Sequence, residues 1–139
     1  MGRARVKALL DTSVLIEGNW EAIPGVYTAI SVVSLAELHF GLLAAPDAKT
    51  RAIRVNRLGL IESRFPDPLA LDDNIARIWG ELQAAVAERG GSPRKRLADL
   101  AIAATAQAHG ALLITTDVKD LEIIEDLVDF RHPPMLRTP

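Results

Sequence analysis

Short apolar runs alternate along this chain with longer segments of helical periodicity, and this alternation restricts the folds that it can adopt. The runs at 6–10, 27–33 and 111–115 are rich in branched aliphatic residues and predict buried strands. Between and around them, amphipathic or alanine-rich segments predict helices at 12–17, 34–44, 48–62, 73–88 and 97–109. Weaker signals predict short strands at 69–71 and 127–130 and a short helix from Val118. Strands separated by helices are typical of an α/β fold with a parallel sheet.

The length of 139 residues predicts a single domain over 1–139. Hydrophobic residues make up 49% of the chain, which excludes a disordered protein, and with only 4% aromatic residues the core must be aliphatic. Pro133 and Pro134 predict poor packing over 131–139. The apolar runs are too short for a secretory signal or a membrane span, so we expect a cytoplasmic protein without membrane contact.

Cysteine content and charge exclude several classes of function. The chain has no cysteine, which excludes a disulfide scaffold, a thiolate zinc site and a cysteine nucleophile. The net charge of −2 excludes nucleic-acid binding through a general positive field. Any nucleic-acid contact must therefore use local basic patches.

Four acidic residues occupy positions that surface solubility does not explain. Asp11 and Asp117 follow predicted strands, and Glu37 and Asp99 lie near the starts of predicted helices. Ligands of open α/β sheets bind beyond the carboxyl ends of the strands, so we expect the four carboxylates to share one crevice. Crowded carboxylates repel each other, and a hard divalent cation relieves that repulsion. The pattern favours metal-assisted hydrolysis of a phosphate ester.

Each of these acids taken alone has a structural alternative. Asp11 and Asp117 could cap the helices that follow them. Glu37 could form a capping box with Ser34, three residues earlier. Asp99 could pair with Lys95, one helical turn away. The joint pattern favours a functional site over these separate explanations.

The motifs around these acids resemble those of PIN-domain ribonucleases, and most closely those of VapC toxins. The resemblance runs over about 6–130 and rests on LLDTSVLI, SLAEL, RLADLAIAATAQAHG and LLITTDVKDL. It implies a three-layer α/β/α sandwich with a central parallel sheet of four to five strands. It also implies a Mg²⁺- or Mn²⁺-dependent endoribonuclease with one or two ions in its site, a homodimer, and inhibition by a cognate VapB-like antitoxin.

Site residues follow from the same resemblance. Asp11, Glu37, Asp99 and Asp117 are the expected metal-binding and catalytic residues. We expect Asp11 and Asp99 to hold the principal ion, Glu37 to orient or deprotonate the attacking water, and Asp117 to complete the site through water. Three further residues match supporting positions, with Asp120 more typical of a helix start: Ser13, Thr115 and Asp120.

Basic residues just before Asp99 are candidates for RNA binding, with an ordinary solvated loop as the alternative. They are Arg89, Arg94, Lys95 and Arg96. A second basic series, Arg51, Arg54 and Arg57, is more typical of an exposed helix face. The alternative to an enzyme is a catalytically silent PIN module that binds RNA or a protein partner. Divalent-metal dependence of RNA cleavage distinguishes the two hypotheses.

Overall fold

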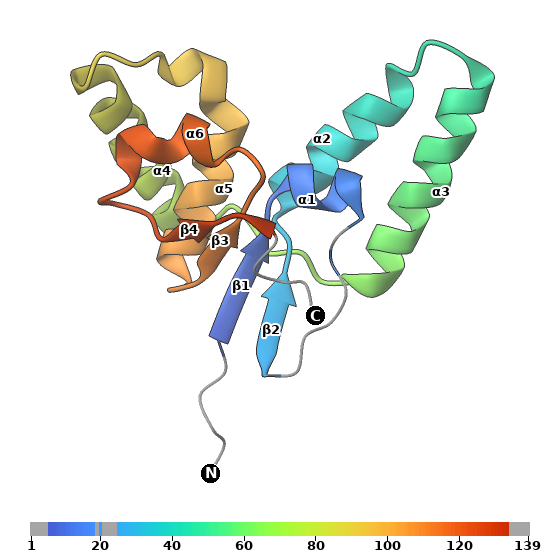
Figure 1. The fold of residues 1–139 in the computed structure, drawn as a ribbon, viewed down its shortest axis with the longest axis horizontal. Coiled ribbons are helices and arrows are strands. Elements are labelled where there is room, and N and C mark those ends of the chain that lie inside the picture. Colours follow the sequence, from blue (N-terminus) through green and yellow to red (C-terminus); the bar gives the residue numbers. More distant parts are fainter. Residues whose placement is uncertain (1–5, 19, 21–24, 134–139) are drawn as a thin grey trace.

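One parallel sheet organises the molecule. The computed structural model describes residues 6–18, 20 and 25–133. The strands are β1 (Val6–Leu10), β2 (Val26–Ala29), β3 (Leu112–Ile114) and β4 (Phe130–Arg131), in the spatial order β2-β1-β3-β4 (Figure 1). Ala8 of β1 pairs with Thr28 on one side and with Leu112 on the other. The predicted α/β class with a parallel sheet is confirmed.

Helices cover both faces of this sheet. They are α1 (Thr12–Glu17), α2 (Val32–Leu43), α3 (Ala48–Arg64), α4 (Asp73–Glu88), α5 (Leu97–Ala108) and α6 (Val118–Leu121). Two 3₁₀ turns, η1 (Pro93–Arg96) and η2 (Glu122–Ile124), precede α5 and follow α6. Side chains of β1 alternate between two cores: Leu9 packs with α4 and α5, whereas Leu10 packs with α1, α2 and α3. This is the expected three-layer sandwich.

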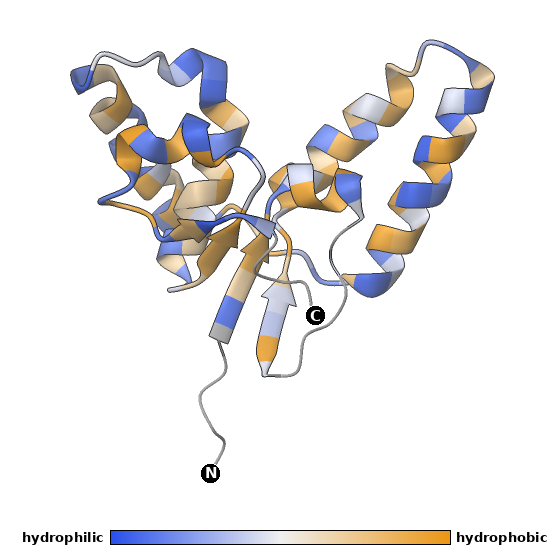
Figure 2. Ribbon diagram, viewed as in Figure 1, coloured by the Kyte–Doolittle hydropathy of each residue, from blue (hydrophilic) through white to orange (hydrophobic). Residues whose placement is uncertain are grey.

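The two helical layers diverge beyond the carboxyl ends of the strands. In Figure 1, α4, α5 and α6 form one lobe and α2 and α3 form a projecting hairpin, with α1 between them. We refer to these parts as the α4–α6 lobe and the α2–α3 arm. Figure 2 shows hydrophobic residues along the strands and also along the arm, where several of them remain exposed.

Helix α2 begins earlier than the sequence predicts. The predicted strand at 27–33 ends at Ala29, and Ser31 is the N-cap of α2, with its Oγ accepting from the Val33 N–H at 3.0 Å. Ser34 therefore lies inside the helix, fully buried. The predicted capping box of Ser34 and Glu37 is wrong, because Ser31 already satisfies a free amide of the first turn.

Smaller differences concern strand ends and one helix face. The predicted strand at 127–130 begins only at Phe130, because the chain is still turning after η2. The segment 69–71 contributes one isolated bridge, between Leu69 and Ser31. On α3, the apolar residue Ile53 is 58% exposed, although an amphipathic helix normally buries its apolar side chains.

The predicted tail at 131–139 overlaps the fold at its start. Arg131 pairs in β4, so the strand pairing continues into the range that the sequence analysis assigned to the tail. Pro133 is buried, and residues 134–139 lie outside the described part of the chain. Within the described ranges, no helix combines the length and the apolar character that a membrane crossing requires.

Candidate metal centre

Three aspartates converge where β1 and β3 end. Asp11 directly follows β1, and its N–H donates to the Ile114 carbonyl of β3 at 2.9 Å. Asp117 follows β3, and Asp99 lies in the first turn of α5. One carboxylate oxygen from each of Asp11, Asp99 and Asp117 lies within 4.8 Å of the others. We call these three residues the aspartate triad.

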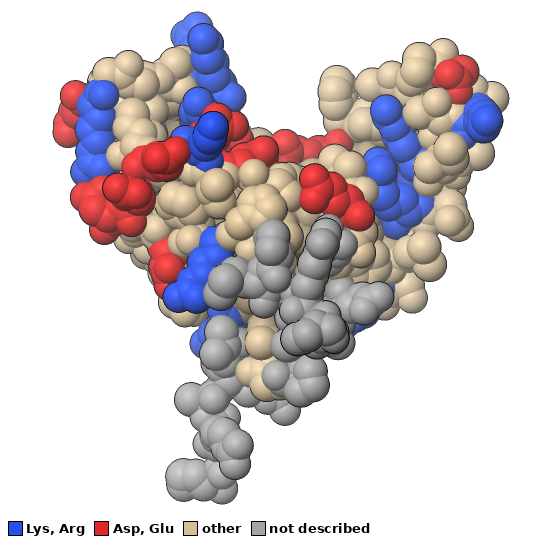
Figure 3. Space-filling model, in the orientation of Figure 1, with Lys and Arg blue, Asp and Glu red and all other residues tan. Residues whose placement is uncertain are grey.

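An acidic hollow lies between the two divergent parts of the molecule. Figure 3 shows acidic side chains gathered in the notch between the α4–α6 lobe and the α2–α3 arm, with Lys and Arg side chains on both flanks.

Hydrogen bonds hold one side of the Asp11 carboxylate. Asp11 is 4% exposed, and its Oδ2 accepts from the hydroxyls of Ser13 at 2.9 Å and Thr115 at 2.8 Å. These hydroxyls in turn accept from the backbone N–H groups of Thr116 and Asp117. No side chain or amide of the described residues donates to Oδ1 of Asp11. That oxygen is therefore available to a cation.

Glu37 lies beside the triad but outside its 4.8 Å grouping. It extends from α2, and its Oε1 accepts from the Thr12 hydroxyl at 2.6 Å. The oxygen of Thr12 also lies 2.8 Å from that of Ser34. The sequence analysis considered Ser34 only as a helix cap. No local pattern marks this network, because it joins residues 22 and 25 positions apart.

Three carboxylates of the site, those of Glu37, Asp99 and Asp117, have raised pKa values. Burial, together with the charges of Asp11, Glu37, Asp117 and Asp120, raises the pKa of Asp99 to about 6. The pKa of Asp117 is raised by burial and by the charge of Asp11. Burial also raises the pKa of Glu37, against the lowering effect of its hydrogen bond from Thr12. A divalent cation would offset this crowding, and hard carboxylate oxygens are the ligands that Mg²⁺ and Mn²⁺ prefer.

The structural alternatives for these acids are not supported. Asp11 and Asp117 stand at the N-cap positions of α1 and α6, but neither side chain makes a capping hydrogen bond. Among the described residues, no ion pair joins Asp99 to Lys95, the partner considered in its alternative explanation. The acids therefore lack the local structural roles that their positions suggested.

The remaining predicted residues separate into two groups. Arg96 forms an ion pair with Asp120 at 2.9 Å, close enough to the site that Arg96 lowers and Asp120 raises the pKa of Asp117. Arg89 instead bonds Asp126 and the Ile123 carbonyl, each at 2.7 Å, and so connects α4 to η2. Arg94 and Lys95 are exposed on η1.

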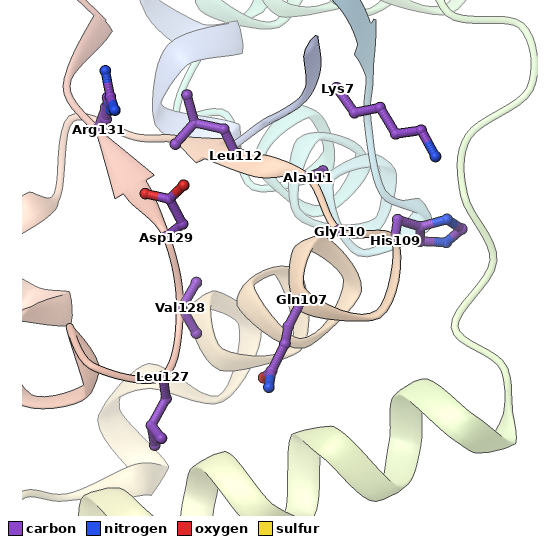
Figure 4. A pocket seen from close by; sticks show the side chains of 10 residues that line it. All are labelled: Lys7, Gln107, His109, Gly110, Ala111, Leu112, Leu127, Val128, Asp129 and Arg131. Carbon is purple, nitrogen blue, oxygen red and sulfur yellow. The ribbon is translucent and has the colours of Figure 1, made fainter. Parts of the chain in front are cut away.

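A second hollow lies at the opposite end of the sheet. Its volume is about 820 Å³, and it is lined by the starts of β1 and β3 and by the segment leading into β4 (Figure 4). The side chains of Lys7 and His109 lie together on one side of it, and those of Asp129 and Arg131 lie on the other (Figure 4). None of the four predicted acids lines this hollow, so it is separate from the triad.

Comparison with known proteins identifies the fold family. Residues 8–125 match the PIN domain. The chain belongs to the PIN-domain family. This PIN domain is 39% identical to Ribonuclease VapC5 of Mycobacterium tuberculosis over 123 residues, covering 84% of this chain and 87% of the relative. It is 34% identical to Ribonuclease VapC4 of the same organism over 128 residues, covering 85% of this chain and 95% of the relative.

A solved structure agrees with this assignment. The PIN domain matches a chain of VapBC-5 from Mycobacterium tuberculosis, described as a member of the VapBC family of toxin–antitoxin systems. The TM-score is 0.74 at 34% identity, over 91% of this chain and 97% of the other. The resemblance that the sequence motifs suggested is confirmed, for the family and for the fold.

Proposed function

We propose that this PIN domain is a Mg²⁺- or Mn²⁺-dependent endoribonuclease and the toxin of a type II toxin–antitoxin pair. The observation that carries the proposal is the aspartate triad at the carboxyl ends of β1 and β3, with Glu37 beside it. The names of the relatives, Ribonuclease VapC5 and VapC4, support RNA as the substrate.

The triad is the proposed ligand set for the principal ion. Asp11 and Asp99 would hold this ion, and Asp117 would complete the site through water. A bound divalent ion supplies a Lewis acid that stabilises the phosphate charge and lowers the pKa of the attacking water. Ser13 and Thr115 keep Asp11 oriented by occupying its Oδ2. Such support fixes the geometry of a metal ligand.

Glu37 is the proposed base that orients or deprotonates the attacking water, directly or through a second ion. Its position outside the 4.8 Å grouping suits this role, since a base needs to reach the water rather than the ion in the triad. Asp120 is paired with Arg96, so its charge is partly offset at the edge of the site. We assign Asp120 a supporting role in shaping the local charge.

RNA binding is assigned to the basic flank of the notch. Arg94 and Lys95 are exposed on η1, next to the start of α5 and Asp99. Cations at such a rim bind phosphates without reading the base sequence. Arg96 and Arg89 already have acidic partners, which offset part of their attraction for a phosphate.

The proposed partners are a VapB-like antitoxin and a second copy of this chain. The relative VapBC-5 is described as part of a toxin–antitoxin family, which supports the antitoxin partner. The exposed apolar residues of the arm provide surface that an interacting chain would cover. We place the protein in the cytoplasm, where an RNA-cleaving toxin meets its substrate.

RNA cleavage by purified, antitoxin-free protein tests the proposal. Total cellular RNA is incubated with Mg²⁺, Mn²⁺ or EDTA, beside the variant Asp99→Asn. The proposal predicts cleavage with either metal that is lost in EDTA and in Asp99→Asn. Folded wild-type protein that binds RNA but cuts it under neither metal would instead indicate the silent module.

A further inference from the structure

Thr12 and Ser34 form a directional hydrogen-bond chain that ends on Glu37. The Thr12 hydroxyl has one proton, and its 2.6 Å contact with Glu37 Oε1 uses that proton, because an ionised carboxylate can only accept. The 2.8 Å contact between Thr12 and Ser34 must then be donated by Ser34. A separation of 2.6 Å is typical of a charge-assisted bond between a hydroxyl and a carboxylate.

The surroundings of this chain keep it rigid. Ser34 is fully buried and Thr12 is 8% exposed, so water does not compete for either hydroxyl. Thr12 begins α1, directly after Asp11, while Ser34 and Glu37 lie one turn apart on α2. Two consecutive residues therefore have separate roles: Asp11 belongs to the triad, and Thr12 holds Glu37.

The geometry of the site shows what this hydrogen bond achieves. Oxygens of Asp11, Asp99 and Asp117 lie within 4.8 Å of one another, whereas Glu37 is outside that grouping. A long glutamate side chain has several accessible rotamers, and a cation in the triad would attract it. A buried hydroxyl donor on Oε1 restrains this movement.

We propose that Thr12, supported by Ser34, is a positioning residue that holds Glu37 apart from the aspartate triad, so that Glu37 acts on the attacking water instead of becoming a fourth ligand of the triad's ion. The inference rests on the proposed metal-dependent nuclease function. It adds a specific role for two hydroxyls whose bonds join α1 to α2.

Four variants of the full-length protein test this role. Thr12→Val removes the Thr12 hydroxyl at nearly constant shape, and Thr12→Ser retains it. Ser34→Ala removes only the hydroxyl that donates to Thr12. Thr105→Val is the matched control, because Thr105 is also fully buried in a helix and its hydroxyl donates to the Ala101 carbonyl, within α5. Each variant is compared for melting temperature, RNA cleavage at saturating Mn²⁺, and Mn²⁺ binding by calorimetry.

The expected pattern separates positioning from stability. Thr12→Val lowers kcat by about 10- to 100-fold, the usual cost of removing a group that orients a catalytic ligand. Its KM for RNA and the Mn²⁺ affinity of the triad stay near wild type, and Thr12→Ser restores kcat. Ser34→Ala has a smaller effect in the same direction. Thr105→Val changes the melting temperature without lowering kcat.

Other results would overturn the inference. A wild-type kcat in Thr12→Val, a loss that Thr12→Ser does not restore, or an equal loss in Thr105→Val would each contradict it. If wild-type protein cuts no RNA, the proposed function fails, and the positioning role is tested by NMR on the Glu37 carboxyl carbon. Mg²⁺ addition should then shift this resonance differently in Thr12→Val than in wild type and Thr12→Ser. An identical response in all three would exclude the positioning role.

Discussion

The α4–α6 lobe and the α2–α3 arm differ in how completely they bury their apolar residues. In α5 every residue from Leu100 to Ala106 is buried. On the arm, Phe40, Leu43 and Ile53 are 58–72% exposed, and Val55 and Leu60 are at least half exposed. The lobe thus has a well-buried core that holds Asp99 in place. The arm carries Glu37 and leaves an apolar surface exposed that is suited to a partner.

The largest expected effect separates Asp99 of the α4–α6 lobe from Glu37 of the α2–α3 arm by their contributions to metal binding. Asp99→Asn should abolish tight Mn²⁺ binding and reduce cleavage by more than the roughly 100-fold typical for a supporting residue of a metal site. Glu37→Gln should also reduce cleavage strongly but leave Mn²⁺ binding by the triad close to wild type. Calorimetry with Mn²⁺ measures the difference. Equal losses of Mn²⁺ affinity would contradict the separation of Glu37 from the triad.

A matched pair of leucine truncations tests the difference in packing. Leu82 on α4 is 2% exposed, and Leu82→Ala should lower the free energy of unfolding by about 2–5 kcal/mol. Leu60 on α3 is 57% exposed, and Leu60→Ala should change it by less than about 0.5 kcal/mol. Urea unfolding of the isolated chain measures both values. A large loss for Leu60→Ala would mean that the arm is covered even in the isolated protein.

The raised pKa of Asp99 predicts how metal binding depends on pH. The pKa is about 6, so below that pH a cation must displace a proton from Asp99. Mn²⁺ affinity should therefore fall by about tenfold per pH unit below pH 6 for one released proton. The weak Mn²⁺ binding that remains in Asp99→Asn, which has no proton to release there, should lack this part of the pH dependence.

The raised pKa of Asp99 also predicts how the stability of the metal-free protein depends on pH. Between the ordinary pKa of 3.8 and the folded value of about 6, the folded state binds more protons at Asp99 than the unfolded state. The free energy of unfolding should therefore decrease as pH rises through this window. Thermal unfolding with EDTA at pH 4.5 and 6.5 measures this change in stability, which should be smaller in Asp99→Asn. The prediction would be contradicted if the metal-free wild type became more stable than Asp99→Asn as the pH rises from 4.5 to 6.5.

The smallest expected effect concerns how the arm is held together. Arg54 donates to the Gly41 carbonyl at 2.7 Å, so it connects α3 to the end of α2. Arg54→Met should lower the free energy of unfolding by about 1 kcal/mol. Arg57→Met is the control and should change it by less than about 0.5 kcal/mol. An equal effect of both variants would show that packing of the long side chains, rather than the hydrogen bond, supports the arm.

The sequence predicted much of the fold because its strongest signals are local. The apolar runs locate β1 and β3, the amphipathic periods locate α3, α4 and α5, and a parallel sheet brings Asp11 and Asp117 to one edge. The motifs then predicted the family. The convergence of Asp99 with these two acids follows from the same topology.

The remaining features depend on contacts that a local pattern does not contain. The sequence predicted Ser34 as the helix cap, but Ser31 caps α2 in the structure, where it also pairs with Leu69 of a distant segment. The role of Thr12 depends on the packing of α1 against α2, which brings its hydroxyl to Glu37. Arg89 and Arg96 looked equivalent as basic residues, but only Arg96 lies beside an acid near the triad.

The bond between Thr115 and Asp11 joins residues 104 positions apart, and this distance has a consequence for synthesis of the chain. A ribosome releases Asp11 and Glu37 long before Asp99 and Asp117. Strand β3 pairs with β1 only after the chain beyond α5 has emerged, and such distant pairings form late. A nascent chain that has not yet exposed Asp117 therefore has no aspartate triad, so the candidate cation site forms only after β1 to β3 have all been synthesised.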